Sequence, residues 1–294
     1  MSKIKTSFSI RAFDYFNFLF LTLYGFITLL PFVYIILSSF TSSREYFAKK
    51  FVFIPSHFSF EGYKYIFSTS TITRGIMVSI TITVVGTFFN LLVTTLLAYP
   101  LSKRYLAGRR YLMMYVIFPM VFSGGMIPTY LVVKGLGLIN SLWALILVSL
   151  INPFNLIVIK NFFQQLPGEL EDAARIDGCG DLSIFFRILL PLSKPVLATF
   201  TIFYAVSHWN SYFNALLYLT NIKLWPVQVW LRQVVISSGG GIGNLGEMGG
   251  DFLPPPANVV KMSVIVVSTL PILIVYPFLQ KHFVKGVLLG SIKG

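Results

Sequence analysis

Six long apolar runs constrain the fold of this chain more than any other feature of its sequence. A helix needs about 20 apolar residues to cross the hydrocarbon core of a bilayer, and each run is close to that length or exceeds it. The chain is 55% hydrophobic and only 11% charged, whereas soluble domains carry about 25% charged residues. We therefore expect an all-α integral membrane protein with six transmembrane helices, at residues 16–40, 75–101, 111–133, 142–162, 195–220 and 259–283.

The third run is the least regular of the six. Its centre, FPMVFSGGMIPTYL, contains Pro119, Gly124, Gly125 and Pro128. Such helix breaks are tolerated inside a membrane bundle where neighbouring helices satisfy the freed backbone groups. The run is therefore retained as an expected span.

The distribution of Lys and Arg predicts the orientation of the chain. Cytoplasmic loops carry an excess of these residues, and the densest cluster, SKRYLAGRR at residues 102–110, follows the second run. This cluster and both termini are then cytoplasmic, as is the loop between the fourth and fifth runs, while residues 221–258 lie outside. No cleavable signal peptide is expected, because the first run is long and lacks a small-residue cleavage site.

The composition also argues against several other classes of protein. The net charge of +13 is not arranged as a basic stripe and accompanies no nucleic-acid motif, so we expect no nucleic-acid partner. Cys179 is the only cysteine, which excludes an internal disulfide. No charged residue is evident at the centre of any run, which argues against a proton-coupled carrier. Sodium-coupled carriers, however, can use backbone carbonyls instead.

One cytoplasmic stretch, PGELEDAARIDGCGDLSIFFRILLP at residues 167–191, contains five of the ten acidic residues. Its proline and its first three acids suit the N-terminal turn of a helix. Leu170, Ala173 and Ala174 would share one face, and Gly178 is a natural helix stop. The pattern predicts a short exposed helix, although a solvated loop with a local helix remains an alternative.

A second short helix is expected directly after this glycine, at LSIFFRILL. Asp181 can cap its N-terminus, and Pro191 would end it. The two short helices are then expected to lie at an angle to each other on the cytoplasmic side.

The spacing within this stretch resembles the EAA loop of bacterial ABC importer permeases. An acid–Ala–Ala triplet is followed after three residues by a glycine, and after nine more by Ile-x-Leu-Pro. Asp172 stands where the family usually has Glu, and Glu171 could share its role. IDGCGDLSIFFRILLPLSKPVLAT, FSGGMIPTYLVVKGLGLINS, WNSYFNALLYL and the ending GSIKG resemble carbohydrate-uptake permeases of the smaller maltose permease type, and most of all permeases served by lipoproteins that bind complex or acidic oligosaccharides.

The resemblance implies that the first helix is a coupling helix seated in a cleft of a cytoplasmic ATPase. The 294 residues contain no G-x-x-x-x-G-K-[ST] phosphate loop, so ATP and Mg would be bound by a separate subunit and this chain would not be an enzyme. The coupling residues implied by the family are Glu169, Glu171, Asp172, Ala173, Ala174, Asp177, Gly178, Ile188, Leu190 and Pro191.

The family also implies the partners. The chain would pair with a second, related permease in the bacterial cytoplasmic membrane, above two copies of the ATPase and beneath an extracytoplasmic solute-binding protein. On this reading residues 1–15 are the cytoplasmic N-terminus, residues 16–283 the permease domain with its coupling loop at 167–191 and docking loop at 221–258, and residues 284–294 a cytoplasmic tail.

The external loop is long for a connector, and long loops are commonly functional or disordered. We interpret it as a surface that docks the binding protein, with a loose loop as the alternative. The candidate docking residues are Trp230, Gly240, Gly241, Asn244, Glu247 and Asp251.

Polar residues in the fourth and fifth runs suggest a sugar path, since amides bond hydroxyls and aromatic rings stack on sugar faces. Ser207, Asn210 and Asn214 would share a helix face, as would Asn152 and Asn155. Hydrogen bonding between helices is the alternative. The candidate path residues are Asn152, Asn155, Ser207, Trp209, Asn210, Tyr212 and Asn214.

Two smaller features complete the expectations. His208 is interpreted as structural, and the three histidines are too far apart in sequence to suggest a metal site. The last four residues, Ser291, Ile292, Lys293 and Gly294, would be a frayed tail or, as in the family, contact the ATPase. Rival functions are a permease of the same architecture for a non-sugar solute, a self-sufficient carrier or channel, and an anchoring protein without a pore.

Overall fold

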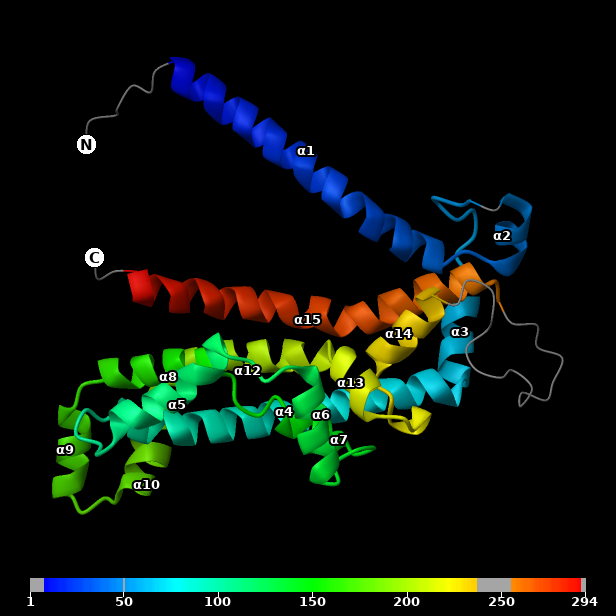
Figure 1. Ribbon diagram of the computed structural model, residues 1–294. Coiled ribbons are helices and arrows are strands. Elements are labelled where there is room, and N and C mark those ends of the chain that lie inside the picture. Colours follow the sequence, from blue (N-terminus) through cyan, green and yellow to red (C-terminus); the bar gives the residue numbers. More distant parts are fainter. Residues whose placement is uncertain (1–7, 50, 237–254, 292–294) are drawn as a thin grey trace. The chain divides into compact units, whose positions relative to one another are not determined.

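The computed structural model describes residues 8–49, 51–236 and 255–291, and in these residues the secondary structure is helical, without strands (Figure 1). Two compact units are present. The first contains Met1–Thr69 and Gln233–Ser268, and the second contains Ser70–Arg232 and Thr269–Gly294. The expected all-α class is confirmed for the part of the chain that the structure describes.

The first unit contains a long apolar helix and a short external segment. Its helices are α1 (Phe8–Ser39), α2 (Ser43–Lys49) and α3 (Glu61–Ser68), followed by the beginning of α15 (Ala257–Ser291). Large apolar side chains of α1 are exposed on all sides, for example Phe16 at 66% and Phe26 at 69%. A helix that is apolar all round needs lipid or another protein around it, which agrees with the expected first span.

Small and polar residues hold the first unit together. The Tyr63 hydroxyl lies 2.6 Å from the Ser39 hydroxyl, and Ser263 donates to the Ser39 carbonyl oxygen at 3.2 Å. Gly62 lies directly against Ser263, where a Cβ atom would collide with the hydroxyl. Glu61 accepts hydrogen bonds from the backbone N–H and the hydroxyl of Ser43.

The second unit is built around α4 (Ser70–Ser102), which packs mainly against α12 (Lys194–Trp209) and α8 (Pro153–Gln165). Leu156, Ile159 and Phe200 form the centre of one apolar core, and Ile82, Leu145 and Tyr218 form the centre of another. The other elements are α5 (Arg109–Val121), α6 (Met126–Gly135), α7 (Leu142–Leu147), α9 (Glu169–Ile176), α10 (Asp181–Ile184), the π-helix η1 (Phe185–Leu189), α11 (Leu190–Leu192), α13 (Phe213–Tyr218), the 3-10 helix η2 (Ile222–Leu224) and α14 (Val227–Ile236).

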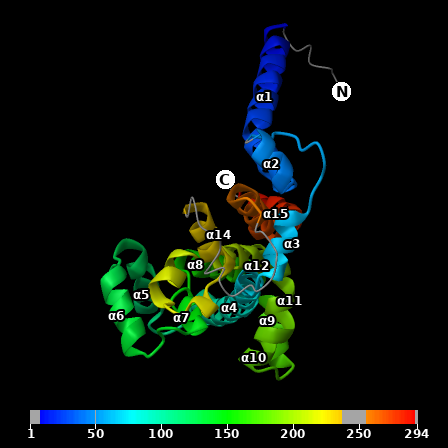
Figure 2. The same ribbon diagram turned by 90° about the vertical axis from the view of Figure 1, so that its right-hand side faces the viewer.

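Three of the six expected spans are continuous helices. Residues 13–39, 70–102 and 257–278 are each long and apolar enough to cross a membrane. The third expected run is α5 and α6, bent by 119° at residues 122–125, and Figure 2 shows the turn between them. Gly125 adopts a φ of 86° there, a backbone conformation that glycine tolerates best.

The fourth and fifth expected spans are interrupted, so the prediction of one continuous helix for each was wrong. Residues 148–152 separate α7 from α8, and residues 210–212 separate α12 from α13. Pro153 begins α8 and lacks the N–H that would continue the earlier helix. An apolar run indicates that a segment is buried in lipid or protein. It does not indicate at which residue the helix and its backbone hydrogen bonds end.

Candidate functional site

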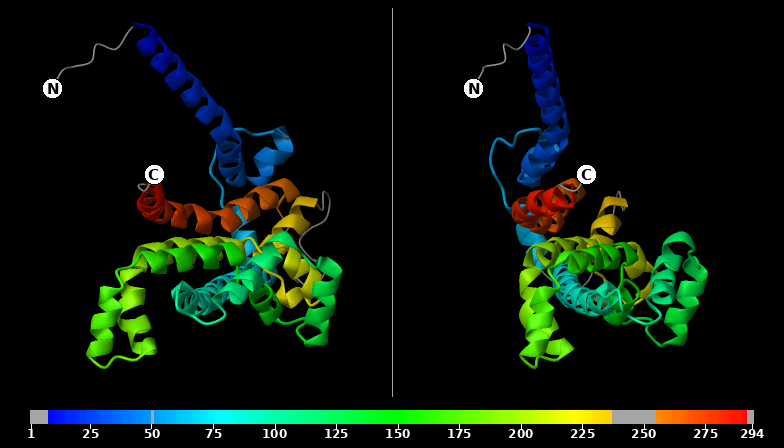
Figure 3. Two further views of the ribbon diagram at one scale, coloured as in Figure 1. Left: turned by 60° about the vertical axis from the view of Figure 1, so that its left-hand side comes forward. Right: turned by 90° about the vertical axis from the view of Figure 1, so that its left-hand side faces the viewer.

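The acidic stretch forms two short arms that connect the end of α8 to the start of α12 and project from the helices there (Figure 3). The first arm is α9, with Glu169, Glu171 and Asp172 in its first turn. It ends at Ile176, followed by the C-cap residue Asp177 and then by Gly178, which has a φ of 81° and open space around it. The predicted helix and its glycine stop are therefore present.

The second arm differs from the prediction. It runs through α10, η1 and α11 to Leu192, so Pro191 lies within the helical run instead of ending it. Pro191 is tolerated because it occupies the first turn of α11 and the π-helical register precedes it. Gly180, not Asp181, is the N-cap residue, and Asp181 occupies the first turn.

A partly buried ion pair ties the first arm to the turn that follows α4. The Lys103 ammonium contacts both carboxylate oxygens of Glu171, and the two side chains are only 15% and 14% exposed. The same ammonium lies 4.6 Å from the centre of the Tyr99 ring, within the range of a cation–π interaction. Glu171 is thus occupied within its own chain.

A second contact ties the turn after α4 to both arms. Arg175 donates to the Tyr105 hydroxyl at 2.9 Å and to Asp181 at 3.2 Å. The Tyr105 hydrogen bond, followed by the Asp181 hydrogen bond, raises the pKa of Arg175, so the guanidinium stays charged. Arg175 also lies 3.9 Å from Asp172, whose side chain is 74% exposed.

Exposure divides the predicted coupling residues into two sets. Ala174 is 6% exposed and packs inside this chain, whereas Ala173 and Asp172 face outward and Leu170 is 42% exposed. The predicted common face of Leu170, Ala173 and Ala174 therefore does not exist as one free surface. The outward set also contains Glu169, Asp177, Gly178 and Pro191, while Ile188 and Leu190 are half-buried.

A neutral polar cluster lies in the interior of the second unit. The Asn90 side-chain amide donates to the carbonyl oxygens of Ser149 and Leu150 at 2.6 and 2.8 Å, where α7 has ended and α8 has not begun. His208 Nε2 lies 2.5 Å from Asn90 Oδ1. Since both amide hydrogens are engaged, this oxygen accepts and His208 carries its proton on Nε2. His208 is structural here, as expected.

Gly86 makes room for this cluster. A Cβ atom at this position would lie 2.5 Å from His208 Nε2 and 2.7 Å from its Cε1. The close approach of α4 and α12 therefore requires glycine for space and not for its backbone conformation.

The predicted sugar-path residues do not share one helix face. Asn152 caps α8 by accepting from the Asn155 backbone N–H at 3.1 Å, and Asn155 is buried. Ser207 is exposed and Trp209 is buried, and α12 ends at Trp209. Asn210 therefore lies beyond the helix, and Asn214 lies on α13, so the predicted common face with Ser207 was wrong. Arg232 lies 4.6 Å from the ring centre of Tyr212.

Most of the predicted docking residues fall outside the described part of the chain. Trp230 is described, but it is 7% exposed, packs on Trp225 and lies against Gly75, so it is a core residue of its own unit. Gly240, Gly241, Asn244, Glu247 and Asp251 are outside the described residues, as are Ile292, Lys293, Gly294 and the side chain of Ser291.

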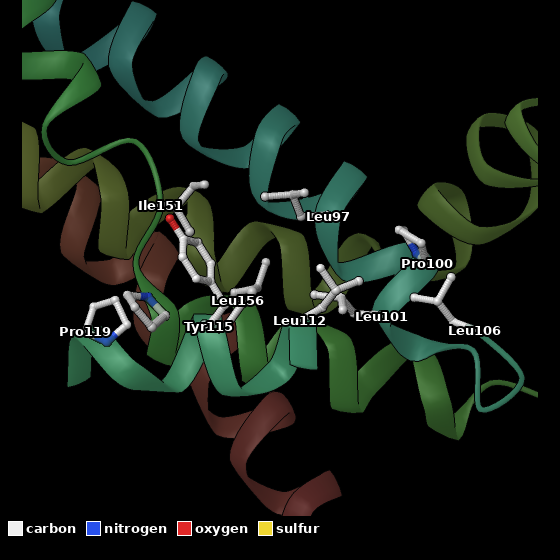
Figure 4. Close-up of a pocket in the computed structure, with 11 residues that line it drawn as sticks. Leu97, Pro100, Leu101, Leu106, Leu112, Tyr115, Pro119, Ile151 and Leu156 are labelled. Atoms are coloured by element: carbon white, nitrogen blue, oxygen red, sulfur yellow. The ribbon is translucent and has the colours of Figure 1, made fainter. Parts of the chain in front are cut away.

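The second unit also contains an apolar cavity of about 490 Å³ between α4, α5 and the start of α8 (Figure 4). Leu97, Leu112, Tyr115, Pro119 and Leu156 are among its lining residues. It contains none of the predicted sugar-path residues and offers sugar hydroxyls few hydrogen-bond partners. Within the described residues, no group of three or more His, Cys, Asp or Glu could hold a metal ion.

Comparison with known families accounts for the exposed acidic arm and the apolar helices together. Residues 93–289 match the model of the family described as "Binding-protein-dependent transport system inner membrane component". The matched segment includes the end of α4, both arms and His208, but begins after Gly86 and Asn90. The chain belongs to this family. It is therefore a membrane-embedded, multi-pass permease subunit of a binding-protein-dependent ABC importer, a transport component and not an enzyme.

Several relatives of this permease match along nearly the whole chain. It is 54% identical, over 97% of its length and 99% of the relative's, to the polygalacturonan/rhamnogalacturonan transport system permease protein YtcP of Bacillus subtilis. It is 56% identical to protein LplC of the same organism, over 97% and 96% of the two chains. A solved structure of a bacterial ABC transporter involved in importing the acidic polysaccharide alginate matches with a TM-score of 0.88 and 32% identity, covering 96% of this permease and 100% of that chain.

Sequence reasoning missed the residues that hold the arms and the centre of the interior cluster. Lys103, Tyr105 and Asn90 were not singled out, although Lys103 lies in the basic cluster used to predict orientation. Excess basic charge on a cytoplasmic turn could have suggested a partner for the acids. Asn90, a lone amide in an apolar run, could have suggested a neighbouring helix break.

Proposed function

We propose that this permease forms half of the translocation pore of an ATP-driven importer for oligosaccharides, acidic ones included. The supporting observation is the 54% identity, along 97% of the chain, to a permease named for polygalacturonan and rhamnogalacturonan transport. The similarity to a component of an alginate importer supports the same substrate class. The other half of the pore is a second, related permease.

The proposed topology has six spans and cytoplasmic termini. Three continuous helices and the bent pair of α5 and α6 are long and apolar enough to cross. The other two proposed crossings are α7 with α8 and α12 with α13. The Lys- and Arg-rich cluster at residues 102–110 favours a cytoplasmic position for the turn after α4. Since the ion pair joins this turn to α9, the acidic arms lie on the same side.

The proposed ATPase contact is the outward set on α9. Asp172 and Ala173 are exposed, whereas Glu171 is paired with Lys103, and the sequence resemblance assigns the exposed residues to the coupling helix. Two ATPase copies bind ATP and Mg, and their closure moves the coupling helices. ATP can drive this change only by favouring one conformation over the other.

The proposed substrate path uses polar groups at the helix breaks. Ser207, Asn210 and Asn214 lie at or near the break between α12 and α13. Tyr212 is half-buried beside Arg232, and a basic group there would favour an anionic sugar. The external loop 221–258 docks the binding protein, and the C-terminal residues contact the ATPase.

Reconstitution in vesicles with the second permease, the ATPase and the binding protein tests this function. We expect ATP-dependent uptake of labelled oligogalacturonides into vesicles and no uptake with this chain alone. A neutral oligosaccharide of equal length is the matched control. Uptake of a non-sugar solute in preference to both would favour the rival permease, and transport by the chain alone would contradict the proposal.

A further inference from the structure

The turn between α4 and α5 contacts both arms of the acidic segment. Lys103 pairs with Glu171 on α9, and Tyr105 accepts a hydrogen bond from Arg175, which also reaches Asp181 at the start of α10. Tyr99, one turn earlier on α4, packs against Phe185 of the second arm with ring centres 5.5 Å apart. The end of α4 therefore holds the angle between the two arms.

We propose that Lys103 is a positioning residue that fixes α9 against α4 and transmits the displacement of α9 to the interior of the permease. This inference rests on the proposed function, because it takes α9 as the ATPase contact. Lys103 itself does not bind the ATPase, since its ammonium is enclosed by Glu171 and the Tyr99 ring. The role is thus distinct from that of the exposed Asp172.

The surroundings make this pair stronger and stiffer than a surface ion pair. Both side chains are largely shielded from water, and removing one partner leaves the other charge uncompensated in a partly buried site, which costs more than it would at an exposed pair. The ammonium contacts both carboxylate oxygens, so α9 cannot rotate freely about the contact. Exposed ion pairs, by contrast, contribute little and are screened by salt.

The base of the contact is braced by neighbouring backbone groups. Gln164, near the end of α8, donates to the Ser102 carbonyl oxygen at 3.0 Å. Arg109, at the start of α5, donates through Nε to the Leu101 carbonyl oxygen at 2.9 Å. Because α4, α5 and α8 are joined here, a force applied through Lys103 acts on the helix end and not on a loose side chain.

A displacement of α9 that passes through Lys103 and α4 would reach the interior cluster around Asn90. Helix α4 is continuous from Ser70 to Ser102 and carries Asn90, whose amide holds the Ser149 and Leu150 carbonyls at the break before α8. A movement of α9 that pulls on α4 therefore changes the register of Asn90 against this break. Such a route requires evidence of coupling and not only of contact.

A charge-exchange series supplies that evidence. The variants are Lys103→Glu, Glu171→Lys and the double exchange, together with Lys103→Arg. Arg104→Glu is the matched control, since this residue is exposed on the same turn and lies outside the proposed ATPase contact. Each variant is assembled with its partners in vesicles, and the membrane level, ATPase copurification, basal hydrolysis and hydrolysis stimulated by loaded binding protein are measured.

We expect the single exchanges to retain copurified ATPase and basal hydrolysis within about twofold, but to lose about tenfold in stimulation, equivalent to ~1.4 kcal/mol. The double exchange should recover most of the stimulation because it restores an opposite-charge pair. Lys103→Arg should keep most of it because the positive charge is retained. The Arg104→Glu control should behave as the original chain. A merely structural role would lower membrane level and all activities together.

The inference is overturned if Lys103→Glu is stimulated normally, or if the double exchange is no better than the single variants at equal membrane level. If the double exchange does not assemble, the Lys103→Arg and Lys103→Met pair decides, with recovery expected only for Arg. A failure of the proposed function is recognised separately, because the unmodified complex would then show no stimulated hydrolysis at all.

Discussion

The acidic arms and the interior cluster solve the same problem with different chemistry. Both join helices distant in sequence, but the arms use charges, Lys103 with Glu171 and Arg175 with Asp181, whereas the cluster uses the neutral groups of Asn90, His208 and two backbone carbonyls. Charged side chains are expensive in the membrane interior, and freed backbone groups there must be satisfied by the protein. Position relative to the bilayer thus decides which chemistry a contact uses.

The comparison is sharpest for its two glycines. Gly178 has a φ of 81° and nothing within 4 Å of its would-be Cβ, whereas Gly86 is helical with its would-be Cβ 2.5 Å from His208 Nε2. Glycine is needed at position 178 for its backbone conformation and at position 86 because a larger residue would collide with His208. The same substitution should therefore have different effects at the two sites.

The largest effect is expected at the centre of the cluster. Asn90→Leu leaves two carbonyls and the His208 N–H without partners, and each buried unsatisfied group costs about 1–3 kcal/mol. We expect a loss of about 2–4 kcal/mol in stability, measured as a lower melting temperature in detergent. Asn152→Leu, which removes only an exposed cap, is the control and should cost about 1 kcal/mol. Equal melting of the two variants would contradict the role of Asn90.

Alanine at the two glycines tests space against conformation. Gly86→Ala should lower the melting temperature, since overpacking a tight contact costs about 1–3 kcal/mol. Gly178→Ala should cost about 1–2 kcal/mol, confined to the end of α9, because alanine resists the left-handed conformation. It should leave the melting of the bundle unchanged and reduce binding-protein-stimulated hydrolysis. The reverse pattern would refute the distinction.

Tryptophan substitutions at Ala173 and Ala174 distinguish the outward face of α9 from the face that packs inside this chain. Ala174→Trp should damage the packing of this chain, because Ala174 is 6% exposed. Ala173→Trp should leave melting unchanged but reduce ATPase copurification about tenfold, equivalent to ~1.4 kcal/mol. ATPase copurification that survives Ala173→Trp undiminished would mean that the outward face of α9 is not the contact.

The smallest effect is expected at a charged residue outside the spans, Glu45. Hydrogen bonds from Ser56 lower the pKa of Glu45 from 4.5 to about 2, with Lys49 contributing less. A lowered folded-state pKa stabilises the fold above the unfolded pKa, and this contribution is lost as the pH falls from about 4.5 to about 2. Hydrogen exchange around residues 43–49 should rise over this window, corrected for the intrinsic pH dependence of exchange. Glu45→Gln should show no such step, and a step above pH 6 would be inconsistent with this cause.

The two regions also differ in how far the sequence predicted them. Helix α9 and its stop follow from local signals, namely early acids and Gly178, so the prediction succeeded there. The Lys103–Glu171 pair joins residues 68 positions apart, and no local pattern specifies it. Similarly, the apolar fourth run gave no local sign of the break at residues 148–152. The carbonyl groups freed at this break are bonded by Asn90, which lies on another helix. Long-range partners therefore explain why Glu171 is paired within the chain and how the break in the fourth span is satisfied.

Site-directed crosslinking provides the most direct test that the outward face of α9 meets the ATPase. Cys179 is the only native cysteine, so Cys179→Ser gives a background in which Ala173→Cys and Ala174→Cys can be compared side by side. With a short bifunctional reagent in the assembled complex, we predict a crosslink to the ATPase from position 173 that changes in yield with bound nucleotide, and little or none from the buried position 174. Absence of a crosslink from position 173, in a complex that hydrolyses ATP normally, would contradict the account.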